Sequence, residues 1–185
     1  MEGVLETPGK MVPLWQARWR ALRERHPYRA ALALGIGLAP LGLVCTAIVG
    51  KLFMVLMPPE LWGNSAAPYL GQLSPARMIL AAVVFAPLLE TLLAQCLPIE
   101  LARRLGAGPA LCMLPSAFLF GLGHYLNGGP AHGATTLFGG LVFAGAYVAL
   151  RAKGIGPAYM AAVTAHAVQN GAVVSLMLAQ AAGSA

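Results

Sequence analysis

Four polar residues in otherwise apolar segments have the types and the spacing that chemistry requires. Glu90 lies in "APLLETLLAQ", His124 ends "FGLGH", and His166 and Asn170 begin and end "HAVQN". Residues four apart share one face of a helix, so His166 and Asn170 project from the same face. Carboxyl and imidazole groups serve in general acid–base catalysis, in zinc sites and in proton relays, and these three kinds of chemistry are the candidates here.

Lipid makes these polar groups costly. An ionisable group at the bilayer centre costs at least about 2.5 kcal/mol, so a functional role is the first hypothesis. Hydrogen bonding between helices, at roughly 0.6 kcal/mol per contact, would suffice to explain a lone histidine or asparagine. A glutamate, two histidines and an asparagine on three segments favour function. Glu90 lies midway between Arg77 and Arg103, and His166 lies roughly 20 Å along a helix from Lys153, so Glu90 and His166 can meet near mid-membrane.

The whole chain is too apolar for a soluble domain. Of its 185 residues, 58% are hydrophobic and only 10% are charged, whereas the charged fraction of soluble domains is about a quarter. Its mean hydropathy is +0.72. The net charge of +6 does not indicate nucleic-acid binding, because most basic residues gather in the first 29 residues and in two short connections, as orientation signals do. The three cysteines lie in apolar segments without ligand-like spacing, which predicts free structural thiols.

The apolar segments predict an all-α, polytopic transmembrane bundle of about five spans. Basic clusters fall on alternate connections: the N-terminus, Arg103 with Arg104, and Arg151 with Lys153. By the positive-inside rule, the N-terminus is then cytoplasmic and the C-terminus external. The connection "NGGPAHG" is expected to be a tight polar loop, with His132 exposed to solvent. The expected spans cover residues 30–57, 78–99, 109–126, 134–150 and 157–180.

Residues 1–29 are expected to form a basic segment ahead of a single transmembrane domain over residues 30–185. Within that segment, Trp15, Trp19 and Leu22 share one helical face with arginines around the rest. This pattern fits an interfacial helix on an anionic leaflet, and equally a plain cytoplasmic flank to the first span. Small residues in the last two spans predict close helix packing. They are Gly139, Gly140, Gly145, Ala161, Ala162 and Ala165.

Three motifs, in order and on separate predicted helices, resemble those of the CPBP family of intramembrane proteases, which includes the CAAX-processing endopeptidases of the Rce1 type. The family pattern is Glu-Glu-x-x-x-Arg, then Phe-x-x-x-His, then His-x-x-x-Asn. The matching stretches here are "ETLLAQ" from Glu90, "FGLGH" ending at His124, and "HAVQN" from His166. The resemblance covers about residues 78–180 and implies that the catalytic core lies there.

The first motif departs from the family pattern. The family's second glutamate is Thr91 here, and its arginine is Gln95. Both residues are neutral, so no unpaired ion is left in lipid, and their spacing allows a hydrogen bond between them. The coherent exchange of both charges suggests a divergent branch of the family. Thr91, Gln95 and Phe120, the last one turn before His124, are expected to support the site or the substrate.

The resemblance implies a glutamic-protease mechanism without a metal or other cofactor. In that mechanism Glu90 is the general base, and His124 holds and polarises the attacking water. His166 and Asn170 donate to the oxyanion. Zinc is the alternative, because a glutamate and two histidines form a catalytic zinc ligand set. The chain contains no H-E-x-x-H motif, which favours the metal-free mechanism.

His124 lies close to the predicted external loop, which suits a substrate whose bulk has already been exported. The small chain resembles the bacterial branch that trims C-terminal sorting tails, as myxosortases do, more than a cytosol-facing CAAX enzyme. The expected partners are the lipid bilayer of the bacterial inner membrane and a membrane-anchored protein with a C-terminal apolar tail. Two other classes stay open: a non-catalytic bacteriocin-immunity or scaffold protein of the same fold, and a small proton-coupled transporter, which would normally show two related halves.

Overall fold

The computed structural model describes residues 13–63 and 67–183, and every regular element in that part of the chain is a helix. Five helices are long and apolar enough to cross a membrane, which confirms the predicted all-α, five-span architecture. They are α2 (Pro27–Leu56), a composite helix (Pro75–Arg104), α7 (Pro109–Gly128), α8 (Pro130–Leu150) continued by η4 (Arg151–Lys153), and α9 (Ile155–Gly183). Two short helices, η1 (Pro59–Leu61) and α3 (Ala67–Leu70), lie between the first two spans.

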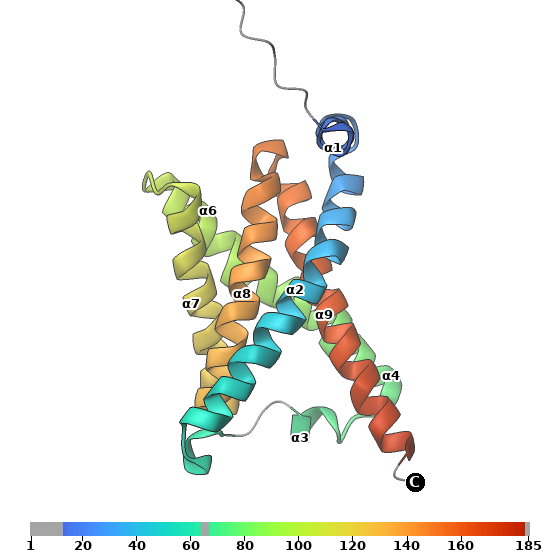
Figure 1. Cartoon of the computed structure of the whole chain (residues 1–185), viewed down its shortest axis with the longest axis vertical. Coiled ribbons are helices and arrows are strands. Elements are labelled where there is room, and N and C mark those ends of the chain that lie inside the picture. The colour runs from blue at the N-terminus through green and yellow to red at the C-terminus, as the bar shows by residue number, and fades with distance from the viewer. Residues whose placement is uncertain (1–12, 64–66, 184–185) are drawn as a thin grey trace, which may run out of the picture.

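Helix α8 is the centre of the bundle, because it contacts α2, α7 and α9. Helices α2 and α9 also contact each other and cross as the two strokes of an X (Figure 1). The composite helix passes diagonally behind them and contacts α7, α8 and α9 through its middle part. The last three spans therefore meet around the middle of the composite helix.

Small residues set how closely these helices approach, as their distribution in the sequence predicted. A Cβ atom added at Gly35 of α2 would lie 2.7 Å from the backbone oxygen of Ala161 in α9. One added at Gly140 of α8 would lie 3.0 Å from Cβ of Phe120 in α7. Ala162 and Ala165 are fully buried on α9. The prediction of close packing by glycine and alanine is confirmed.

Two prolines make the second span a composite rather than a uniform α-helix. Its two π-helical turns end at residues where the N–H bonds the carbonyl five positions back, Ala86 and Leu97. These residues directly precede Pro87 and Pro98. A proline has no N–H, and its ring clashes with the carbonyl four residues earlier, so a widened turn accommodates it. The segments are α4 (Pro75–Ile79), η2 (Leu80–Phe85), α5 (Ala86–Glu90), η3 (Thr91–Cys96) and α6 (Leu97–Arg104).

The predicted polar loop over residues 127–133 is wrong. Helix α7 continues to Gly128 and α8 begins at Pro130, so only Gly129 separates them. Gly129 has a φ of 85°, a left-handed conformation that favours glycine, and Pro130 suits the first position of a helix. The chain thus reverses within one residue. His132, expected in a solvent-exposed loop, lies instead in the first turn of α8 and is partly buried.

The basic clusters lie at one end of the bundle, where α1 (Leu14–Arg25) runs across the helix ends and is seen end-on (Figure 1). An ion pair joins Glu24 to Lys153, and the hydrogen bond from this lysine holds the pKa of the Glu24 carboxyl below its ordinary value. Arg23 donates to the carbonyl oxygen of Ala149 over 3.3 Å. Helix α1 is thus tied to the end of α8.

Helix α1 has no buried residue, and Trp15 is 68% exposed. A short helix that lies across the bundle end with an exposed tryptophan is the arrangement expected of an interfacial helix. At the same end, Arg151 donates to Glu100 over 2.9 Å and so links the fourth span to the second. The three basic connections share this end, as alternate connections of a membrane bundle must. The assignment of that end to the cytoplasm, and the domain boundary near residue 29, stay predictions.

Candidate active site

Three of the four residues singled out in the sequence come together from three different spans. The Oε2 atom of Glu90, on the composite helix, lies 3.7 Å from Nε2 of His124 on α7. The same oxygen lies 3.7 Å from Nε2 of His166 on α9. Both separations exceed a direct hydrogen bond, and a water molecule at about 2.8 Å from each atom fits beside such a pair. The site therefore offers one carboxylate oxygen to two imidazole nitrogens.

His166 is held in a fixed plane inside the bundle, with only 2% of its surface exposed. Its ring stacks on Phe143 of α8 at a centroid distance of 4.6 Å and an interplanar angle of 18°. The edge of Phe120 packs against it at 5.2 Å. Its Nδ1 atom lies 3.4 Å from Oγ1 of Thr91. Aromatic walls thus orient His166 so that Nε2 faces Glu90.

His124 is oriented by its own helix. Its Nδ1 atom lies 2.8 Å from the carbonyl oxygen of Phe120, one turn earlier. A carbonyl oxygen only accepts, so Nδ1 carries the hydrogen and donates. The Phe120 ring packs on the imidazole at 4.4 Å, and the His132 ring lies 5.0 Å away. Phe120 therefore touches both histidines, and its supporting role stays a prediction.

Asn170 hydrogen-bonds to the backbone of the composite helix. Its Nδ2 atom donates to the carbonyl oxygen of Ala82 over 2.8 Å. In the π-helical register of η2, that carbonyl would accept from the residue five positions later, which is Pro87 and has no N–H. Asn170 thus satisfies a carbonyl that the proline leaves without a partner in its own helix. One hydrogen of the Asn170 amide remains for another acceptor.

The expected hydrogen bond between Thr91 and Gln95 is not formed. Thr91 contacts His166 instead, and both side-chain polar atoms of Gln95 are buried without a hydrogen-bond partner in the described chain. The reason is the π-helical turn η3, which contains both residues. Residues four apart superpose on an α-helix but are offset on a wider turn. Thr91 and Gln95 are each fully buried, so both belong to the core of the bundle.

Sequence reasoning missed two side chains of the site. Phe143 stacks on His166, but a phenylalanine in an apolar span carries no signal that separates it from ordinary core residues. His132 did carry a signal, as a polar residue near His124, and the wrong loop assignment concealed it. Tyr159 of α9 also contacts the second span, because its hydroxyl donates to the Leu88 carbonyl over 2.6 Å.

The charge environment of the site consists of one carboxylate and its histidines. The Glu90 side chain is 39% exposed, and the ion-pair partners within 4.0 Å in the described chain are His124 and His166. Across residues 13–63 and 67–183, no cluster of three His, Cys, Asp or Glu side chains is arranged to hold a metal ion. Glu90 is therefore partly exposed, and among the described residues no lysine or arginine lies within 4.0 Å to pair with it.

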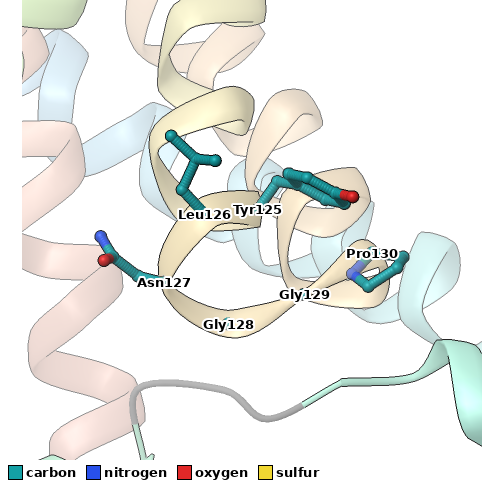
Figure 2. A pocket seen from close by; sticks show the side chains of 6 residues that line it. All are labelled: Tyr125, Leu126, Asn127, Gly128, Gly129 and Pro130. Carbon is teal, nitrogen blue, oxygen red and sulfur yellow. The ribbon is translucent and has the colours of Figure 1, made fainter.

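A shallow pocket of about 390 Å³ lies beside the site, at the turn between α7 and α8 (Figure 2). It begins at Tyr125, the residue after His124, and its lining continues to Pro130. The Tyr125 and Asn127 side chains point to opposite sides of the turn. None of Glu90, His166 and Asn170 lines this pocket, so it is a surface depression next to His124 in the chain and does not contain the candidate site.

The model of the family described as type II CAAX prenyl endopeptidase Rce1-like matches residues 72–172, more than half of the chain. The chain belongs to the Rce1-like family. The matched range contains all four residues of the candidate site, Glu90, His124, His166 and Asn170. No curated protein and no solved structure matches the chain. As an Rce1-like protein with five membrane-spanning helices, it is a multi-pass membrane protein, and its family membership supports a protease.

Proposed function

We propose that the protein is an intramembrane endopeptidase of the glutamic type. It hydrolyses a peptide bond near the C-terminal, membrane-associated tail of a protein substrate. The observation that carries the proposal is the position of Glu90 Oε2, at 3.7 Å from Nε2 of both His124 and His166. Three spans converge to form this arrangement, and in the described part of the chain no lysine or arginine pairs with the carboxylate. Structural hydrogen bonding would not require such an open carboxylate.

In the proposed reaction, Glu90 takes a proton from a water molecule that also hydrogen-bonds Nε2 of His124. The water oxygen attacks the carbonyl carbon of the scissile peptide bond, and the carbonyl oxygen becomes an oxyanion. His166 and the free amide hydrogen of Asn170 donate to this oxyanion. The protonated Glu90 then gives its proton to the leaving nitrogen as the carbon–nitrogen bond breaks. Two peptides are released and the carboxylate is restored.

The orientation of His124 supports its role in this scheme. Its Nδ1–H donates to the carbonyl oxygen of Phe120 over 2.8 Å, which leaves Nε2 of the neutral ring as an acceptor. A water that donates one hydrogen to Glu90 and the other to His124 keeps its lone pairs free for attack. Phe120 supports the site by contact with both imidazoles.

The placement of the site along the bundle supports a substrate that arrives from the side opposite the basic clusters. His124 lies in the last turns of α7, whose other end adjoins the basic Arg103 and Arg104. If that basic end faces the cytoplasm, the site opens toward the exterior. We therefore propose an exported, membrane-anchored substrate with an apolar C-terminal tail, and a bacterial inner membrane as the location.

The proposal is tested with purified protein in detergent and a membrane-anchored reporter that carries an apolar C-terminal tail. Glu90→Gln is expected to lower cleavage by about 10²–10⁴-fold, since general acid–base catalysis contributes that much. Glu60→Gln, which removes an exposed glutamate of η1, is the matched control and keeps wild-type activity. Equal cleavage by wild type and Glu90→Gln would refute the role of this carboxylate.

A chelator distinguishes the metal-free mechanism from the zinc alternative. Glu90 and the two histidines are donor types that zinc accepts, so the distinction needs a measurement. We expect cleavage to survive prolonged treatment with a zinc chelator. Activity that disappears on chelation and returns with zinc would replace the glutamic mechanism by metal-assisted hydrolysis.

A further inference from the structure

The two histidines that face Glu90 have different partners on their other ring nitrogen. His124 Nδ1 has the backbone oxygen of Phe120 at 2.8 Å, and His166 Nδ1 has the hydroxyl of Thr91 at 3.4 Å. A carbonyl accepts only, whereas a hydroxyl both donates and accepts. A neutral imidazole carries one donor and one acceptor nitrogen, so the partner of Nδ1 decides the character of Nε2.

For His124 the carbonyl leaves one arrangement for the neutral ring, with the hydrogen on Nδ1 and a lone pair on Nε2. For His166 both arrangements are open to the Thr91 hydroxyl, and the facing carboxylate selects between them. Nε2 of His166 lies 3.7 Å from Oε2 of Glu90, and a carboxylate oxygen attracts an N–H and repels a lone pair. The favoured state therefore has the hydrogen on Nε2, and the Thr91 hydroxyl donates to Nδ1.

We propose that Thr91 is a positioning residue, which donates its hydroxyl hydrogen to Nδ1 of His166 and so stabilises the ring in the state that has its hydrogen on Nε2. This inference rests on the proposed function for its catalytic meaning. The two imidazoles then face Glu90 with opposite hydrogen-bonding character. His124 presents an acceptor to the attacking water, and His166 presents a donor to the developing oxyanion.

Among the described residues that surround the His166 ring, Thr91 is the one that offers a hydrogen bond to Nδ1. Its side chain is fully buried, and His166 is 2% exposed, so bulk water does not compete for the contact. Phe143 stacks on one face of the His166 ring, and Phe120 meets it with an edge. These two phenylalanines fix the plane of the ring but offer no hydrogen-bonding atom to its nitrogens. Thr91 directly follows Glu90 in the chain, so one turn of helix places the base and the positioning group together.

The test reads the position of the hydrogen directly, by ¹⁵N NMR of the histidine rings in the purified full-length protein. The chain contains four histidines, and the signals that disappear in His166→Ala assign His166. Wild type is expected to show a protonated Nε2 and an unprotonated Nδ1. Thr91→Ser keeps the hydroxyl and both resonances, whereas the nearly isosteric Thr91→Val leaves the hydrogen on Nε2, which the Glu90 carboxylate favours, but shifts the ¹⁵N resonance of Nδ1 because that nitrogen loses its hydrogen-bond donor. A wild-type ring with the hydrogen on Nδ1, or an Nδ1 resonance that is unchanged in Thr91→Val, overturns the proposal.

The kinetic constants kcat and KM of the Thr91 variants distinguish a positioning role from a merely structural one. Thr91→Val is expected to lower kcat by about tenfold at unchanged KM, because the lost hydrogen bond matters only when the oxyanion forms. Thr91→Ser restores kcat. A change in KM alone, or a loss that serine does not rescue, contradicts the role. The NMR result is independent of cleavage, so failure of the proteolytic function and failure of this inference are distinguished.

Discussion

Asn170 and Pro87 are expected to act on one carbonyl, and this coupling can be measured. The Ala82 carbonyl accepts from Asn170 over 2.8 Å, and the residue five positions after it, Pro87, has no N–H to offer. In Asn170→Ala this buried carbonyl loses its partner. An unsatisfied buried acceptor costs about 1–3 kcal/mol, whereas measured hydrogen bonds between membrane helices average roughly 0.6 kcal/mol and reach about 1.7 kcal/mol.

The expected loss for Asn170→Ala is therefore about 1–2 kcal/mol. For a chain of this length, each kcal/mol shifts the melting temperature by roughly 2–4 °C, so Tm should fall by about 2–8 °C in detergent. Asn127→Ala is the matched control, because Asn127 is exposed and donates to the carbonyl oxygen of Gly123 in its own helix. A change of the control within about 0.5 kcal/mol is expected.

The decisive variant is Pro87→Ala, which supplies the missing N–H. In the Asn170→Ala background it should recover most of the lost stability, whereas in wild type it should recover little because the carbonyl is already satisfied. The two effects are thus non-additive, as expected for groups that share one partner. Equal effects of Pro87→Ala in both backgrounds, or an unchanged Tm in Asn170→Ala, would refute the account of the composite helix.

Two further outcomes are expected. Gly35→Ala should lower stability by about 1–3 kcal/mol in thermal melts, because its Cβ would lie 2.7 Å from the Ala161 carbonyl oxygen, whereas Gly37→Ala, with open space around it, should not. The lowered pKa of Glu24 means that its ion pair to Lys153 stabilises the docking of α1 above the ordinary glutamate pKa of 4.5, and that this stabilisation is lost as pH falls through the lower folded-state value. Tryptophan fluorescence of α1 should report this acid-induced release, which Lys153→Gln should abolish. Lys51→Gln, at the other end of the bundle, should leave the release unchanged.

The number of membrane spans could be predicted from the sequence, because it depends on the length of the apolar segments. Five apolar segments of adequate length predicted five spans, because lipid leaves few alternatives to a helix. The meeting of Glu90 and His166 also followed, since equal depth along a helix is a matter of residue count. The small residues of α8 and α9 correctly indicated close packing.

Local backbone geometry was the part that could not be foreseen. The expected pairing of Thr91 with Gln95 assumed a regular α-helix, and Pro87 and Pro98 introduce π-helical turns that change which residues share a face. The polar appearance of residues 127–133 suggested a loop, yet one glycine with positive φ suffices for the turn. That error placed His132 in solvent rather than beside His124.

The central claim is that Glu90 activates water for hydrolysis of a peptide bond. It is tested most directly by mass spectrometry of the products from a membrane-anchored reporter, with the purified protein in H₂¹⁸O and a zinc chelator present. We predict two peptides from wild type, with a single ¹⁸O atom in the new C-terminal carboxyl group, and product formation slower by about 10²–10⁴-fold with Glu90→Gln. The same labelled products at the same rate from Glu90→Gln would contradict the claim.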